Sequence, residues 1–359
     1  MTGRSRIAGQ HEWEATFGRD ELGRPVPPAR HLLIFVDVVG RPGDAAERHL
    51  ESALATLEAR HPHGRDGILS TIGWGPRWWD RHTGHPGLIA QPARMSRWED
   101  PVIDDADAVF HLASDHEDVL ADAEDGLFGS GGSAQGEFLR VREVRRGFVG
   151  AGLPSRVLPE LGIPATSPLL FGFHSVHRGS QAPEPNITIE RGPLAGGTTQ
   201  HVSRIELDVE RWQALDRDSQ AALLYAPTVT AAHAATLVDD APSDYERYEQ
   251  TVSEHGIVGH AQAAARARVD NVPVINRRDF ATVDDGRPGT HFVALQKELR
   301  DFNNTRAIMN GADGSDHHRA VGARRRNGIN AFFDVTRRAT FGIPARALRA
   351  YPHRRGWRH

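Results

Sequence analysis

The residue best placed to do chemistry is His260, in the segment GHAQAAARAR at 259–268. Small residues surround it in the chain and leave room for a flat, bulky ligand: Gly259, Ala261, Ala263 and Ala264. A neutral imidazole is the usual protein ligand of haem iron, and its second ring nitrogen needs an acceptor that fixes the tautomer. Because the chain has 20 histidines, the pattern alone favours an ordinary core or surface histidine over a metal ligand.

The composition narrows the chemistry further. The chain of 359 residues contains no cysteine, which excludes disulfides, thiolate nucleophiles and cysteine-ligated metals or clusters. A bound metal must therefore rest on histidine or carboxylate side chains. The net charge of -4 and the charged fraction of 25% are typical of a soluble surface. No apolar run approaches the roughly 20 residues of a membrane helix, and the first residues lack the apolar part of a signal peptide, so we expect a cytoplasmic protein.

The elements that must position His260 begin with an N-terminal α+β pattern. The apolar run HLLIFVDVV at 31–39 predicts a central strand, and the next segment predicts an amphipathic helix that Asp44 caps. Further strands and a second helix are expected at 67–74, 108–116, 117–129 and 138–149. The resulting order of strand, helix, strand, strand, helix, strand is that of a ferredoxin-like domain.

A similar pattern starts again in the second half. Residues 198–208 predict a strand, residues 209–225 predict helices with Asp208 and Asp216 as N-caps, and a strand at 290–296 precedes another helix. The predicted fold class is α+β with two ferredoxin-like domains. The predicted divisions are an irregular arm at 1–30, a first domain at 31–157, a linker and loop at 158–197, a second domain at 198–350 and a basic tail at 351–359.

Five segments occur in the order of a known family. They are GFHSV at 172–176, GGTTQHVSRIELDVERW at 196–212, GHAQAAARAR at 259–268, VINRRDF at 274–280 and GTHFVALQ at 289–296. With these segments the chain resembles the dye-decolourising (Dyp-type) haem peroxidase family over roughly residues 31–350. The resemblance implies antiparallel sheets of the dimeric α/β-barrel type, haem b as the iron cofactor, hydrogen peroxide as the oxidant and an organic molecule as the reductant.

The resemblance also assigns roles to individual residues. His260 matches the family's proximal haem ligand, and Arg277 matches its distal arginine, whose guanidinium stabilises negative charge on the departing oxygen. Arg278 should point the other way, as a contact of a haem propionate or as a surface salt-bridge partner. Phe292 matches an aromatic residue that forms either haem wall or plain core.

The loop at 172–176 departs from the family pattern. Ser175 stands where the family has an aspartate that relays the peroxide proton, and Val176 stands where a glycine belongs. Loss of a positioned acid or base typically costs a factor of about 100 to 10,000 in rate. His174 and His177 flank the position and are alternatives for this role, although histidines in such loops are more often solvent-facing.

These observations leave three functions open: a haem peroxidase with weakened activity, a haem-binding protein without turnover, and a haem-free scaffold.

Trp212 and Tyr225 are either electron relays or core residues. The cluster DGSDHHRA fits a solvated loop better than a metal site, although it contains Asp313, Asp316, His317 and His318. The arginines from Arg319 onward fit an ordinary surface better than a nucleic-acid site. We expect no nucleic-acid and no membrane partner, and homo-oligomerisation stays open.

Overall fold

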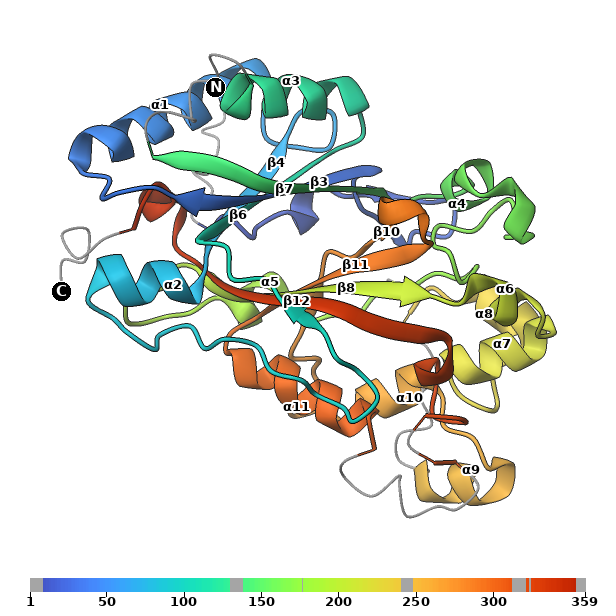
Figure 1. The fold of residues 1–359 in the computed structure, drawn as a ribbon. Helices are drawn as coiled ribbons and strands as arrows, with labels where there is room; N and C mark the ends of the chain where they lie inside the picture. Colours follow the sequence, from blue (N-terminus) through green and yellow to red (C-terminus); the bar gives the residue numbers. More distant parts are fainter. Residues whose placement is uncertain are drawn as a thin grey trace.

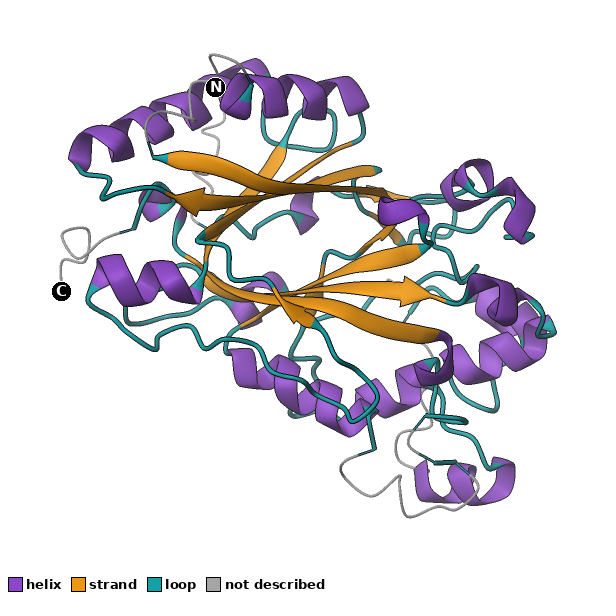
Figure 2. Cartoon of the chain, viewed as in Figure 1, coloured by secondary structure: helices purple, strands orange, loops and turns teal. Residues whose placement is uncertain are grey.

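The computed structural model describes residues 9–129, 138–175, 177–239, 248–311, 321–322 and 324–352. Two β-sheets face each other, and helices cover the outer side of each sheet (Figures 1 and 2). The sheets join into one ring of strands because β10 (Phe280–Thr282) pairs with β7 of the first sheet and with β11 of the second. On the other side of the ring, β4 pairs with β12 at Trp74 and Gly342. The predicted α+β fold of the dimeric α/β-barrel type is confirmed.

The first sheet is ferredoxin-like. Its strands are β3 (Arg30–Val38), β4 (Leu69–Trp74), β6 (Ala108–Ser114) and β7 (Leu139–Phe148), in the antiparallel order β7-β3-β6-β4. Helices α1 (Asp44–Arg60) and α3 (Glu117–Phe128) cover its outer face. Helix α1 begins at Asp44 with Gly43 at the N-cap, so the prediction that Asp44 caps this helix was wrong.

The second sheet repeats this topology. Its strands are β8 (Thr198–Leu207), β9 (Asn276–Arg277), β11 (Gly289–Gln296) and β12 (Phe333–Ile343), in the order β12-β8-β11-β9. Helix α11 (Leu299–Met309) connects β11 to β12. A set of shorter helices fills the connection from β8 to β9: α6 (Val209–Gln213), α7 (Arg217–Leu224), α8 (Ala231–Thr236), α9 (Tyr248–His255) and α10 (His260–Ala265). The predicted caps are confirmed, because Asp208 and Asp216 accept from the amides of Arg211 and Ser219.

The inner faces of the two sheets form a shared apolar core. Leu33, Phe35 and Val109 of the first sheet cluster with Val202, Val293, Ala339 and Phe341 of the second. Because side chains alternate along a strand, every second residue of these strands points away from this core toward the outer helices. On β8, β11 and β12 these outward residues face α10 and α11, where the candidate site lies.

The remaining elements are short. They are β1 (Gly18–Arg19), β2 (Pro25–Val26), α2 (Pro76–Trp78), β5 (Val102–Ile103), α4 (Leu153–Val157) and α5 (Glu184–Ile187). The described part of the arm, from residue 9, is packed against the body. Trp13 is buried, and Gln10 Nε2 donates to the carbonyl of Pro344 at 2.9 Å. Among the described helices, none has the length and apolar content of a transmembrane span.

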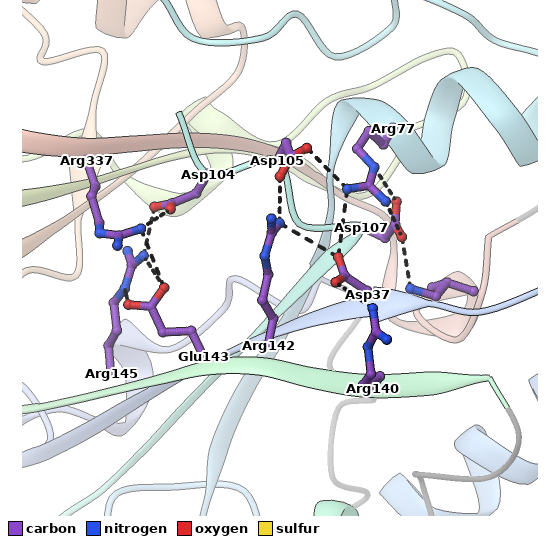
Figure 3. A network of polar contacts seen from close by, with 11 residues as sticks. Asp37, Arg77, Asp104, Asp105, Asp107, Arg140, Arg142, Glu143, Arg145 and Arg337 are labelled. Carbon is purple, nitrogen blue, oxygen red and sulfur yellow. Dashed lines mark hydrogen bonds and ion pairs between the residues drawn. The ribbon is translucent and has the colours of Figure 1, made fainter. Parts of the chain in front are cut away.

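A network of arginine and carboxylate side chains links the two sheets at one edge (Figure 3). Arg145 of β7 pairs with Asp104 at 2.8 Å and with Glu143 at 2.7 Å. Arg337 of β12 pairs with the same Asp104 at 2.7 Å. Further pairs join Arg142 to Asp105, and Arg77 to Asp105 and Asp107. The arginine-rich segment after Arg319 therefore contributes, at Arg337, to the joint between the sheets.

Candidate functional site

A cavity of about 260 Å³ lies between the outer face of the second sheet and helices α10 and α11, and residues 169–175 and 177–180 contribute its third wall. Most of its lining is apolar, including Leu170, Phe171, Ile205, Phe302, Met309 and Ile329. An apolar cavity with a few converging polar groups is the usual form of a site for a small molecule or cofactor. All predicted site residues except Arg278 line it: His174, Ser175, His177, His260, Arg277 and Phe292.

His260 is the first residue of α10 and contributes to the helical wall. The residue is half-buried and lines the cavity, and its side chain makes no hydrogen bond to the described residues. Burial lowers the pKa of His260 to about 3, and the positive charges of Arg277 and Arg306 contribute. At neutral pH the imidazole is therefore uncharged, with a nitrogen lone pair free to bind a metal.

The chain holds the start of α10 tightly by close backbone approach. A Cβ added at Gly259 would lie 2.0 Å from the carbonyl oxygen of Tyr225, and one added at Gly328 would lie 2.9 Å from Cα of His260. Gly328 also has φ +53°, a left-handed conformation that glycine adopts without strain. Gln262 completes the helix start by accepting from the amide of Gly259 at 3.1 Å. These contacts fix the position from which His260 projects.

Arg277 reaches the cavity from the sheet. It lies on β9, pairs with Ala294 of β11, and its Nη2 donates to the carbonyl oxygen of Ser175 at 2.6 Å. Asp279, two residues further along the extended chain, lines the same cavity because alternate residues share a face. Within the described lining, Asp279 is the one carboxylate, and it forms no hydrogen bond or ion pair with described residues.

Arg278 points to the opposite side of the strand. Its side chain is buried, and Nη2 forms an ion pair with Oε1 of Glu184 at 2.7 Å. The guanidinium also lies over the rings of Trp13 and Phe17, at 5.8 and 5.2 Å from the centroids. The sequence prediction that Arg278 points away from Arg277 therefore agrees with its position. The position of Arg278 does not fit the expected propionate contact, because Arg278 is absent from the described cavity lining. It instead connects Trp13 of the N-terminal arm to Glu184 of the linker.

The loop at 169–180 brings two neutral histidines to the cavity. His177 is buried, its Nε2 has no partner among described residues, and its ring lies 5.9 Å from that of Tyr225. Burial lowers the pKa of His174 and of His177 to about 4. Tyr225 donates from its hydroxyl to the carbonyl of His174 at 2.8 Å, which fixes the loop. His177 is buried and His174 half-buried, and both line the cavity, whereas histidines in such a loop are more often exposed.

Three further arginines line the cavity, and sequence reasoning missed them as site residues: Arg268, Arg306 and Arg338. Arg306 lies on α11, and Arg338 lies on β12 beyond a bulge that shifts the strand register between Val335 and Arg337. Without the bulge, alternation would turn Arg337 toward the cavity instead. Arg338 forms a fully buried pair with Glu99, with both side chains 1% exposed. Arg306, by contrast, has no carboxylate partner among the described residues.

Sequence comparison identifies the family, whose model covers residues 28–345. The chain belongs to the Family of unknown function (DUF7405). No curated protein matches the chain. Membership in this family therefore brings no activity with it, and a function must be argued from the cavity and its residues.

The fold is shared with Dyp-type peroxidases. DypB from Rhodococcus jostii RHA1 is 17% identical, with a TM-score of 0.64 over 97% of this chain and 99% of that chain. A variant of DypB in complex with heme gives the same identity and TM-score over 96% of this chain. A dye-decolorizing protein from V. cholerae is 14% identical, with a TM-score of 0.59 over 94% of this chain and 98% of that chain. At these identities the similarity establishes the architecture.

Other candidate sites of the sequence fare differently. The cluster with Asp313, Asp316, His317 and His318 lies outside the described residues. Elsewhere in the described chain, no group of three or more histidines and carboxylates is arranged to hold a metal ion. Trp212 is fully buried and packs on Phe171 at 4.6 Å, as a core residue does.

Proposed function

We propose that this chain is a haem-dependent peroxidase of the dye-decolourising type, which uses hydrogen peroxide to oxidise organic molecules. The observation that carries the proposal is the neutral imidazole of His260, which lines an apolar cavity together with Arg277. No described residue forms a hydrogen bond with this imidazole. The fold shared with heme-binding DypB supports the same interpretation.

The donor set and the walls of the cavity fit a haem. His260 supplies a neutral nitrogen ligand, and Ala261 and Ala264 on the same helix leave space beside it. Aromatic and aliphatic side chains supply the apolar surface that a porphyrin ring requires. When bound, haem would supply the two electrons that peroxide reduction requires, and the organic reductant would restore them.

The polar residues of the cavity would bind peroxide and move its proton. The guanidinium of Arg277 is a fixed positive charge that would stabilise negative charge on the departing oxygen. A base must accept the proton from one peroxide oxygen and return it to the other, which leaves as water. The neutral imidazoles of His174 and His177 and the unpaired carboxylate of Asp279 are the candidates. The Ser175 hydroxyl cannot act as this base.

A second candidate function is haem binding without turnover, and Ser175 favours it. The carbonyl of Ser175 accepts from Arg277 Nη2. Its hydroxyl is not a base, although dye-decolourising peroxidases have an aspartate at the matching position. This alternative predicts stoichiometric haem uptake with negligible peroxide-dependent oxidation. The two candidates therefore share the cofactor and differ in the proton acceptor.

Hemin titration tests the shared part of both functions. We expect the purified protein to take up one hemin per chain with a Soret band typical of histidine ligation. His260→Ala should abolish this band or weaken hemin binding about 100-fold or more. His233→Ala, an exposed residue of α8, is the matched control and should leave the titration unchanged. A Soret spectrum that is identical in wild type and His260→Ala would remove the ligand assignment.

Steady-state dye oxidation by the hemin-loaded protein separates the candidates. If the chain is a peroxidase, we expect His174→Ala, His177→Ala or Asp279→Asn to lower kcat about 100-fold, identifying the proton acceptor. Ser175→Asp should raise activity if the rest of the site is competent. Hemin uptake without turnover in the wild type, together with a gain in Ser175→Asp, would instead establish the binding protein.

A further inference from the structure

Arg306 is a buried cation without a counter-charge among the residues that the structure describes. It is 8% exposed and lines the cavity from α11, and its Nε has no partner among the described residues. Its polar contact is with Oδ1 of Asn330, from Nη2 at 3.4 Å, and its guanidinium lies 5.0 Å from the centroid of the Phe333 ring. Neither neighbour carries a negative charge. Buried arginines are normally paired, because a guanidinium taken out of water loses its hydration.

Glu99, the buried carboxylate whose charge acts on Arg306, is already engaged. Arg338 Nη2 donates to both of its oxygens, at 3.0 and 2.9 Å. Glu99 Oε1 also accepts from the amides of Met95 and Ser96. The buried guanidinium groups of Arg306 and Arg338 therefore have one buried carboxylate near them, and this carboxylate bonds to Arg338. The result is an excess of positive charge at the wall of the cavity, next to Arg306.

We propose that Arg306 binds a carboxylate of the molecule that occupies the cavity, which in the proposed function is a propionate of haem. This inference rests on the proposed function and extends it by naming the residue that selects an anionic porphyrin. A guanidinium offers carboxylate oxygens a planar pair of N–H donors, and exclusion of water from an apolar cavity strengthens this bond. Neutral porphyrins of the same shape should lack this contact.

Iron-free porphyrins test the contact without iron ligation. Protoporphyrin IX and its dimethyl ester have the same ring, but esterification removes both negative charges. We expect the wild type to bind the free acid about 10- to 100-fold more tightly than the ester, measured by quenching of tryptophan fluorescence. Arg306→Met should lose most of this preference by weakening binding of the acid, with little effect on the ester.

Matched variants isolate the charge of Arg306. Arg300→Met removes a cation from the same helix, but Arg300 is exposed and pairs with Glu298, so the preference should stay as in the wild type. Arg306→Lys keeps the charge and should retain part of the preference. It also replaces Arg306→Met in the comparison if the methionine variant fails to fold.

The outcomes separate this inference from the proposed function. Equal binding of acid and ester by the wild type, or an unchanged preference in Arg306→Met, would overturn the role of Arg306. If hemin still binds through His260 in that case, the proposed function stands. If hemin, the free acid and the ester all fail to bind, the proposed function is contradicted and this inference with it.

Discussion

Arginines serve different purposes in two regions of this molecule. In the network of Figure 3, at the edge between the sheets, Arg77, Arg142, Arg145 and Arg337 all pair with carboxylates. In the cavity wall, Arg338 pairs with Glu99, but Arg277 donates to a carbonyl and Arg306 has no carboxylate partner among the described residues. An unpaired buried cation reduces stability and is available to a ligand that brings the missing charge.

Histidines show the same division. In the barrel interior, His31 Nδ1 lies 3.0 Å from Nε2 of His111, and His31 Nε2 lies 3.0 Å from the carbonyl of Pro28. These rings are buried and use their nitrogens within the protein. At the cavity, His260 and His177 each have a ring nitrogen with no hydrogen-bond partner among the described residues. In these four histidines, the rings in the barrel interior are bonded within the protein, whereas the rings at the cavity are available to a ligand.

The largest effect is expected at the pair between Glu99 and Arg338. Glu99→Gln removes the negative charge that compensates Arg338 and leaves two uncompensated guanidinium groups close together. We expect the free energy of unfolding to fall by about 3–5 kcal/mol, because both side chains are buried. Urea unfolding followed by circular dichroism measures this change. A loss below about 1 kcal/mol would show that the pair is not a stabilising element of the cavity wall.

The sheet-edge network should give the next largest effect. Arg145 is 3% exposed and contacts two carboxylates, so Arg145→Met should lower the free energy of unfolding by about 2–3 kcal/mol. Arg142→Met, in the same network, removes a half-exposed arginine and should cost less than about 1 kcal/mol. Equal losses in the two variants would contradict the dependence on burial.

The buried histidines make stability depend on pH. Burial lowers the pKa of His31 to about 3, below the ordinary value of 6.5, so the unfolded chain binds a proton more readily than the folded protein. Stability from this group is therefore complete above pH 6.5 and declines as the pH falls toward 3. At pH 5 the loss from His31 should be about 2 kcal/mol. Urea unfolding at pH 7.5 and pH 5 should show a smaller pH effect in His31→Gln than in the wild type.

The smallest effect is expected at Arg306. Because Arg306 has no carboxylate partner among the described residues, Arg306→Met should lower the stability of the ligand-free protein by less than about 1 kcal/mol, or should increase it. The same urea titration provides the direct contrast with Arg145→Met. A loss as large as that of Arg145→Met would mean that Arg306 supports the fold, and the division between the two regions would fail.

Much of the fold could be predicted from the sequence because local patterns carry it. A near-continuous apolar run predicted the central strand at 31–39, and the helical spacing of Leu50, Leu54 and Leu57 predicted α1. Asp208 and Asp216 marked helix starts. Closure of the barrel could not be predicted this way. The single pairing of Ala281 with Phe148 joins segments more than 130 residues apart and leaves no local signal.

The sequence alone determined that His260 begins a short helix of small residues, and that Arg277 and Arg278 point to opposite faces of a strand. Both follow from helix and strand geometry, which neighbouring residues set. Tertiary structure decided which charges meet. The bulge in β12 turns Arg338 toward the cavity and Arg337 toward Asp104. Glu99 compensates Arg338, while Arg306 has no carboxylate partner in the part of the chain that the structure describes. Such pairings depend on distances between segments remote in the chain, so spacing along the sequence does not encode them.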